Sequence, residues 1–172
     1  MNKHACSVCQ KTKSLNQCES CGDTVCKSCT QFIGEDTFKY QVYKPKNVQH
    51  NIYCPTCYNE YVAEAVDQYT NTLDAANNII VFEKTQSKET RLMKRLEDPI
   101  KLQNETDRHD ALMKMAFIAV QRHFNAIIDV EITPQKVRDG SYQTTIYTCS
   151  AIPVTIEDRH IIKDRSFRSS PN

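Results

Sequence analysis

The chain has 172 residues, nine cysteines and a formal net charge of +1. This balance excludes a strong general attraction to nucleic acid or to an anionic membrane. No apolar run approaches the roughly 18 residues that a membrane-spanning helix needs.

Eight of the nine cysteines form four C-x-x-C pairs within residues 6–57. A C-x-x-C turn points two thiolates at one metal ion, and two such turns complete a tetrahedral four-thiolate zinc site. The alternative is a disulfide framework, but that needs an oxidising compartment, and the N-terminal residues contain no apolar signal region. We therefore expect two structural Zn2+ ions in a cytoplasmic protein of a reducing compartment.

The four pairs can share two ions in two ways. Sequential pairing would join the first two pairs on one ion and the last two on the other. Only residues 22–25 separate the second pair from the third, and such a short connection favours two different, well-separated ions. The preferred arrangement is therefore interleaved, with Cys6, Cys9, Cys26 and Cys29 on the first ion and Cys18, Cys21, Cys54 and Cys57 on the second.

Both sites are expected to be structural, and no catalytic residue is predicted. Four thiolates fill the tetrahedral coordination of zinc and leave no position open for water or substrate. His4 and His50 flank the ligands and could replace one, but every cysteine pair is already complete.

The rest of the first domain predicts strands and one helix. Residues 37–44 alternate apolar and polar side chains, as in a half-buried strand, and residues 52–53 could return to the last ligand pair. A helix should begin near the last ligands and end at Asn77-Asn78. One face of this helix is an apolar stripe formed by Tyr58, Tyr61, Val62, Ala65, Tyr69 and Leu73. We expect the stripe to pack within this protein, and the alternative is that it binds a partner.

A resemblance follows from the ligand pattern. Cys18-Glu-Ser-Cys21-Gly22-Asp-Thr-Val25-Cys26-Lys-Ser-Cys29, with Tyr53-Cys54-Pro-Thr-Cys57-Tyr58, resembles the FYVE and FYVE-related zinc fingers over about residues 1–75. The resemblance implies an interleaved two-zinc cross-brace followed by a helix. That family is best known for binding phosphatidylinositol 3-phosphate on endosomal membranes. Its lipid-reading motifs are missing, because the chain has no tryptophan and has Leu15-Asn-Gln and Asn51-Ile-Tyr where the family has basic residues.

The finger has three alternative functions to consider. A phosphoinositide- or membrane-directed module remains one alternative, through the FYVE scaffold alone. Cys54-Pro-Thr-Cys57 also resembles RING fingers, so a ubiquitin-ligase module is another. The third alternative is a nucleic-acid-binding face, which could form from Lys11, Lys13, Lys39, Lys44 and Lys46 with Tyr40 and Tyr43. It is not expected, because residues 1–60 contain no arginine, and their seven lysines are nearly balanced by five acidic residues.

The second half predicts a strand, a helix and further strands. A short apolar strand is expected at 79–82, and near-helical spacing of Leu92, Met93 and Leu96 follows, stopped by a proline. Asn104 and Asp107 suggest a cap for a mostly buried helix over about 105–124, with His123 on its apolar face. Strands are then predicted at 128–132, 142–149 and 152–156, with an Asp-Gly turn after the first, and residues 158–172 form a flexible tail.

This half has a weaker resemblance of its own. Residues 110–120, the Asn125-Ala-Ile-Ile-Asp-Val130 strand and Ser150–Ile156 resemble a small bacterial α+β domain family described as heavy-metal-binding, over about residues 79–157. The resemblance implies ring-like oligomers, commonly pentamers. Metal binding is not expected here, because His109, His123 and Cys149 are scattered, and we interpret Cys149 as a core thiol.

Together these observations predict a small zinc-stabilised cross-brace finger with a C-terminal helix, followed by a separate α+β domain with a helix packed on a mainly antiparallel sheet. The domains are 1–77 and 78–157, followed by the tail. The function expected is that of a non-enzymatic zinc-binding adaptor, in which the finger binds a protein partner and residues 78–157 form a homo-oligomer.

Overall fold

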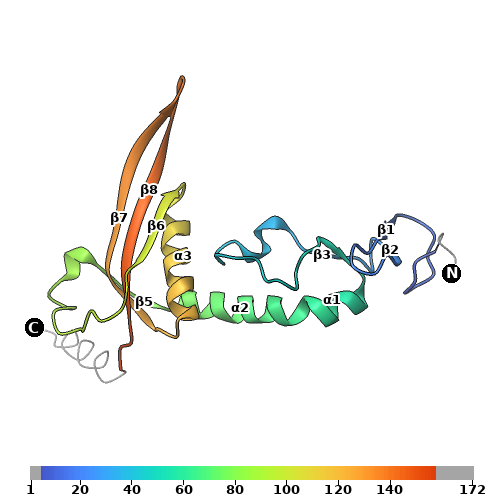
Figure 1. Ribbon diagram of the computed structural model, residues 1–172, viewed down its shortest axis with the longest axis horizontal. Coiled ribbons are helices and arrows are strands. Elements are labelled where there is room, and N and C mark those ends of the chain that lie inside the picture. The colour runs from blue at the N-terminus through green and yellow to red at the C-terminus, as the bar shows by residue number, and fades with distance from the viewer. Residues whose placement is uncertain (1–4, 158–172) are drawn as a thin grey trace, which may run out of the picture. The chain divides into compact units, whose positions relative to one another are not determined.

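The computed structural model describes residues 5–157 (Figure 1). These residues belong to two compact units, and the division falls between Asn71 and Thr72. It lies inside helix α2 (Ala63–Asn77), which the sequence analysis placed wholly in the first domain. The tail predicted at 158–172 lies outside the described residues.

The first unit is built from two small hairpins and two helical segments. Strand β1 (Leu15–Gln17) pairs antiparallel with β2 (Thr24–Cys26), and β3 (Gln31–Phe32) pairs antiparallel with β4 (Ile52–Tyr53). Between them lies the 3-10 helix η1 (Glu35–Phe38), and α1 (Pro55–Tyr61) follows β4. The buried apolar side chains are few: Val25, Ile33, Phe38, Val48, Tyr53, Val62 and Tyr69.

The helix predicted after the last ligands is confirmed. Cys54 is its N-cap and Pro55 occupies the first turn, where the missing N–H of proline costs no hydrogen bond. The helix is interrupted once, at Val62, which ends α1 before α2 begins. Val62 and Tyr69 are both buried, so this part of the apolar stripe packs within the protein, whereas Tyr61 is 40% exposed.

The strand predicted at residues 37–44 is wrong. Phe38 ends the 3-10 helix, and its ring packs edge-on against Tyr69 with the centroids 5.3 Å apart. The next residues form turns, in which Val42 and Tyr43 point into solvent. The alternating pattern was present, but a strand needs a neighbouring strand to bond its backbone, and the described structure places none beside this segment.

The second unit is a four-stranded mixed sheet with the order β5-β7-β8-β6. Strand β5 (Ile80–Glu83) runs parallel to β7 (Ala126–Asp139), and the other pairs are antiparallel. Strand β8 (Tyr142–Val154) is continuous, where the sequence suggested two strands, and β6 is Ile100–Glu105. Helix α3 (Arg108–Gln121) lies beside the sheet, and a short 3-10 helix η2 (Lys84–Gln86) follows β5 (Figure 1).

The two faces of this sheet are covered differently. Helix α3 packs its buried face on one side, in a core that includes Met115, Ile127 and Cys149. On the other side a smaller cluster around Ile128 and Val154 receives Met93 from the segment that follows β5. This unit therefore has an α+β fold with a hydrophobic core of its own.

Three details of the second unit differ from the prediction. Residues 92–96 are not helical, and Leu92 and Leu96 are 88% and 80% exposed, because Met93 alone turns inward. Strand β6 was missed, although Ile100 and Leu102 alternate with polar residues. Helix α3 begins later than expected: Asp107 is its N-cap and accepts the Asp110 N–H at 2.9 Å. His123 lies beyond its end and is exposed.

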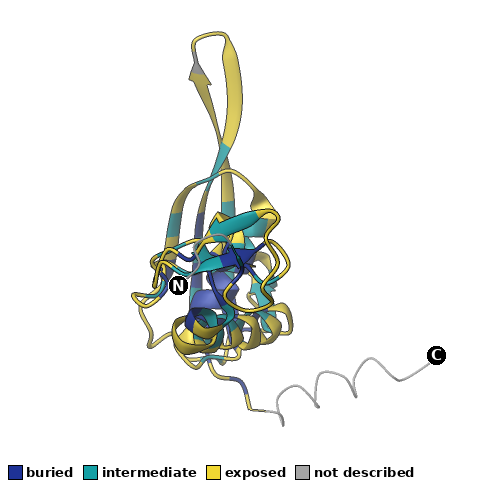
Figure 2. Cartoon of the chain, turned by 90° about the vertical axis from the view of Figure 1, so that its right-hand side faces the viewer, coloured by how far each residue is buried: buried dark blue, intermediate teal, exposed yellow. Residues whose placement is uncertain are grey.

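A long two-stranded arm extends from the sheet. The pairing of β5 with β7 ends at Glu83 and Val130, and that of β6 with β8 ends at Glu105 and Tyr147. Beyond these points only β7 and β8 pair with each other, up to the turn at Gly140, whose φ of +58° fits the predicted Asp-Gly turn. The arm projects beyond the other strands in Figure 1 and is largely exposed in Figure 2.

Candidate metal centre

The two hairpins of the first unit distribute its eight cysteines into two groups. In the first hairpin, Gln17 pairs with Thr24 near the turn that holds Cys18 and Cys21. Strand β2 then leads away from that turn and ends at Cys26, opposite Leu15. The four residues 22–25 thus carry the chain from one group to the other, as the short spacing predicted. The second hairpin repeats this, because β3 follows Cys29 and β4 precedes Cys54.

The resulting geometry suits two tetrahedral metal ions. One group contains Cys6, Cys9, Cys26 and Cys29, and the other contains Cys18, Cys21, Cys54 and Cys57, with the sulfur atoms in each group within 4.8 Å of one another. This is the interleaved arrangement of a cross-brace. The Sγ atoms of Cys21 and Cys54 are 3.8 Å apart, and those of Cys9 and Cys26 are 3.5 Å apart. A Zn–S bond of ~2.3 Å in a tetrahedron requires sulfurs roughly 3.8 Å apart.

Tight turns hold each of the first two C-x-x-C pairs. The N–H of Gln10 donates to the carbonyl of Cys6 at 2.9 Å, and that of Gly22 donates to Cys18 at 2.8 Å. Both residues adopt a left-handed conformation, with φ of +62° at Gln10 and +80° at Gly22. Glycine reaches this conformation without strain, which explains Gly22. The two turns have the same local structure, and only the second has a glycine at the left-handed position.

Backbone amides favour the thiolate form of one cysteine in each group. Burial raises the pKa of Cys6, but N–H groups of Cys9, Cys26 and Val8 bind its sulfur and bring the pKa down to about 6.

In the second group Cys18 is in the same situation. Burial again raises its pKa, and amides of Cys21, Cys54 and Ser20 lower it to about 7. These N–H groups stabilise negative charge on sulfur, which is the form that binds zinc.

Each group also holds a thiol that keeps its proton when no metal replaces it. A hydrogen bond with the Cys26 sulfur, reinforced by burial, raises the pKa of Cys29 to about 12. Burial raises the pKa of Cys21 to about 12, together with hydrogen bonds to the neighbouring sulfurs. Four clustered thiols therefore share protons rather than all ionising. A divalent cation at the centre would take the place of those protons.

One further contributor, Glu19, was not predicted from the sequence. Its carboxylate accepts the N–H of Asn51 at 2.7 Å and the N–H of Ile52 at 3.2 Å, and its own N–H donates to the Ile52 carbonyl at 2.9 Å. These bonds attach the segment before Cys54 to the turn that holds Cys18. No spacing rule marks such a residue, because its partners are backbone atoms more than thirty positions away.

The donor set fits zinc and leaves no open position. Thiolates select Zn2+ over harder cations such as Mg2+ and Ca2+, and four of them complete its coordination. Among the described residues, no fifth ligand joins either group. His50 stacks edge-on against Tyr53 with centroids 6.0 Å apart and is not part of a group, and His4 lies outside the described residues.

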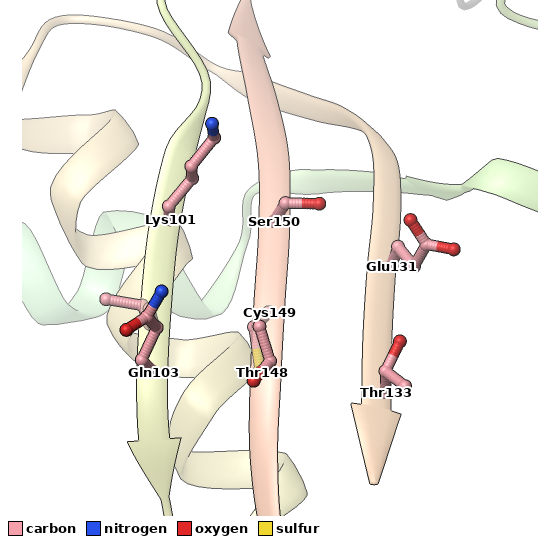
Figure 3. Close-up of a pocket in the computed structure, with 8 residues that line it drawn as sticks. Lys101, Gln103, Glu131, Thr133, Thr148, Cys149 and Ser150 are labelled. Carbon is pink, nitrogen blue, oxygen red and sulfur yellow. The ribbon is translucent and has the colours of Figure 1, made fainter. Parts of the chain in front are cut away.

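The candidate residues of the second unit do not converge. Cys149 is buried beneath α3, and burial raises the pKa of its thiol, which keeps it protonated. His109 and His123 are exposed on different segments. An open depression on the sheet is lined by polar residues together with Leu102 and Cys149, and Figure 3 shows Glu131 and Ser150 there. Glu131 is bound by Lys84 at 2.8 Å, and no histidine lines the depression.

Comparison with known proteins adds no identification. No family model matches the chain, and no curated protein or solved structure matches it. Within residues 5–157, no helix is long and apolar enough to cross a membrane.

Proposed function

We propose that this protein is a non-enzymatic zinc-binding adaptor, in which the first unit holds two structural Zn2+ ions and presents a protein-binding surface. The observation that carries the proposal is the pair of complete four-cysteine groups. A catalytic zinc keeps one position for water or substrate, whereas four thiolates per ion fill every position. The FYVE-like order of the ligands supports a structural scaffold of the same kind.

Zinc would stabilise a unit that has little else to hold it. Its apolar core is small, and its strands are two or three residues long. Structural zinc contributes folding free energy directly, on the order of 10 kcal/mol in small fingers. The metal therefore fixes a surface whose shape a partner can recognise.

Cobalt substitution tests the two closed sites. The chain should bind two Co2+ per molecule, with the visible absorption of tetrahedral thiolate coordination at both. A spectrum of five- or six-coordinate cobalt would contradict closed sites. Zinc-dependent formation of ubiquitin chains, or flotation on vesicles that depends on a monophosphoinositide, would replace the adaptor with one of the two alternative functions.

We further propose that the second unit forms a homo-oligomer through its arm. An isolated two-stranded ribbon is marginally stable in water, so a ribbon of this length needs another surface. One face of the arm carries Val137 and Tyr142, which are 37% and 81% exposed, and the half-buried Ile146. These side chains share a face because Val137 pairs with Thr144, Gln135 with Ile146 and Asp139 with Tyr142.

Shortening the arm tests this part. Gln135 and Ile146 are paired across the hairpin, so an Asn-Gly turn that replaces residues 136–145 would join them and keep Tyr147, which packs against the core beneath α3. Light scattering should give a multiple of 19.8 kDa for the full chain and a monomer for the shortened one. A monomeric full chain, or an unchanged oligomer after shortening, would contradict the proposal.

A further inference from the structure

The loop between Phe38 and Val48 is fixed at both ends. Phe38 packs on Tyr69, and Val48 is 1% exposed. Next to Val48, the Asn47 side chain donates to the Tyr61 carbonyl at 2.5 Å. The loop therefore holds a defined conformation on the helices of the first unit.

Its tip presents apolar side chains to solvent. Val42 is 54% exposed and Tyr43 is 82% exposed, and they are neighbours in the chain. These residues belong to the segment whose pattern predicted a half-buried strand, but their side chains are exposed. Exposed apolar side chains that adjoin one another and are surrounded by polar residues can form part of an interaction site. Tyrosine is among the residues that most often contribute binding energy at such sites.

The same loop is locally basic. No aspartate or glutamate occurs between Asp36 and Glu60, whereas Lys39, Lys44 and Lys46 are exposed. Within residues 5–157, neither Lys44 nor Lys46 forms a salt bridge. The loop therefore combines an apolar tip with the positive charges of Lys44 and Lys46, which form no salt bridge with a carboxylate of residues 5–157.

We propose that residues 39–46 dock an acidic peptide segment of the protein partner, with Tyr43 as its apolar anchor and the lysines as counterions for its carboxylates. The inference rests on the proposed adaptor function, because it names the surface and the partner chemistry of the zinc-stabilised unit. A loop fixed in advance loses little entropy on binding, which favours recognition of a short segment.

The charge of the whole unit favours a peptide over a larger polyanion. Residues 1–71 contain seven lysines, no arginine and seven acidic residues, and two zinc ions on eight thiolates leave the unit four charges negative. A nucleic acid or an anionic bilayer extends past the loop and meets that negative charge. A short peptide stays within about one Debye length, ~8 Å, of the lysines.

Fluorescence anisotropy tests the docking with a defined probe. The probe is a labelled peptide that repeats Glu-Glu-Leu, and the matched probe repeats Lys-Lys-Leu. The zinc-loaded full chain should bind the acidic probe saturably and the basic probe at least tenfold more weakly. Tyr43→Ala and Lys44→Glu should each weaken binding of the acidic probe by about tenfold, which corresponds to about 1.4 kcal/mol.

Matched variants and a metal count make each outcome decisive. Leu92→Ala removes an apolar side chain of the other unit that is as exposed as Tyr43, and Lys13→Ala removes another exposed lysine, so both variants should bind the acidic probe normally. Absent binding, or equal binding by Tyr43→Ala, in a chain that holds two zinc ions would overturn this inference and leave the zinc sites standing. Tighter binding of oligothymidylate or phosphatidylserine vesicles through Tyr43 would overturn it in favour of those ligands. A chain without zinc would contradict the proposed function itself.

Discussion

Replacing Ile127 by alanine should destabilise the second unit and leave zinc binding unchanged. Ile127 is fully buried in the core beneath α3, beside Met115 and Cys149. Removing its buried methyl and methylene groups costs about 2–5 kcal/mol, because transfer free energy is lost and a cavity remains. For a domain of roughly 60–100 residues this lowers the melting temperature by about 10 to 30 °C.

Scanning calorimetry of the zinc-loaded chain measures this effect. We expect two transitions, of which only one moves in Ile127→Ala, and an unchanged zinc content by elemental analysis. Leu92→Ala is the control, because Leu92 is 88% exposed and its truncation should change stability by less than about 0.5 kcal/mol. If the variant loses zinc, or if both transitions fall together, the two units fold cooperatively and their division at α2 is wrong as a description of stability. Protein concentration must be equal in all runs, because oligomerisation shifts melting temperatures.

Three further predictions concern the metal centre. Cys26→Ser should lower the zinc content from two ions to one or none and abolish the transition of the first unit alone, and an unchanged zinc content would contradict the ligand assignment. Glu19→Ala should speed the loss of zinc to a chelator, because the segment before Cys54 loses its hydrogen bonds to the carboxylate. Glu19→Gln keeps an acceptor oxygen and should lose zinc more slowly than Glu19→Ala. Equal rates for the wild-type chain and both variants would contradict this role of Glu19. Zinc binding should release protons at neutral pH, because the thiols of Cys21 and Cys29 have pKa values of about 12 and must ionise. Affinity should therefore fall as the pH is lowered from about 8 to about 6, and a pH-independent affinity in chelator competition would refute thiolate ligation.

The metal groups were predictable because a chemical constraint acts on them directly. Four C-x-x-C pairs leave few ways to complete tetrahedral sites, and the short connection at residues 22–25 favoured the interleaved one. The helix after Cys54 and the Asp-Gly turn at Gly140 were also foreseen, since caps and positive φ values depend on local residues.

The wrong predictions concern segments whose conformation depends on contacts with residues far away in the sequence. Residues 37–44 alternate like a strand, yet Phe38 alone finds a buried site, on Tyr69. Leu92 and Leu96 have helical spacing, but the segment is held instead by Arg95, whose guanidinium binds Asp129 at 2.5 and 3.0 Å. Asp129 lies at a bulge in β7 with a φ of +52°, and its neighbouring residues in the sequence do not predict that conformation.

The proposed function requires two zinc ions per chain, each bound by four thiolates. Native mass spectrometry of the freshly purified chain, kept reduced and never treated with chelator, measures this directly. We predict a mass of 19.8 kDa per chain plus two zinc ions, less the four protons whose charge the two Zn2+ ions replace. One zinc ion or none, or a mass lowered by disulfide formation among these eight cysteines, would contradict it.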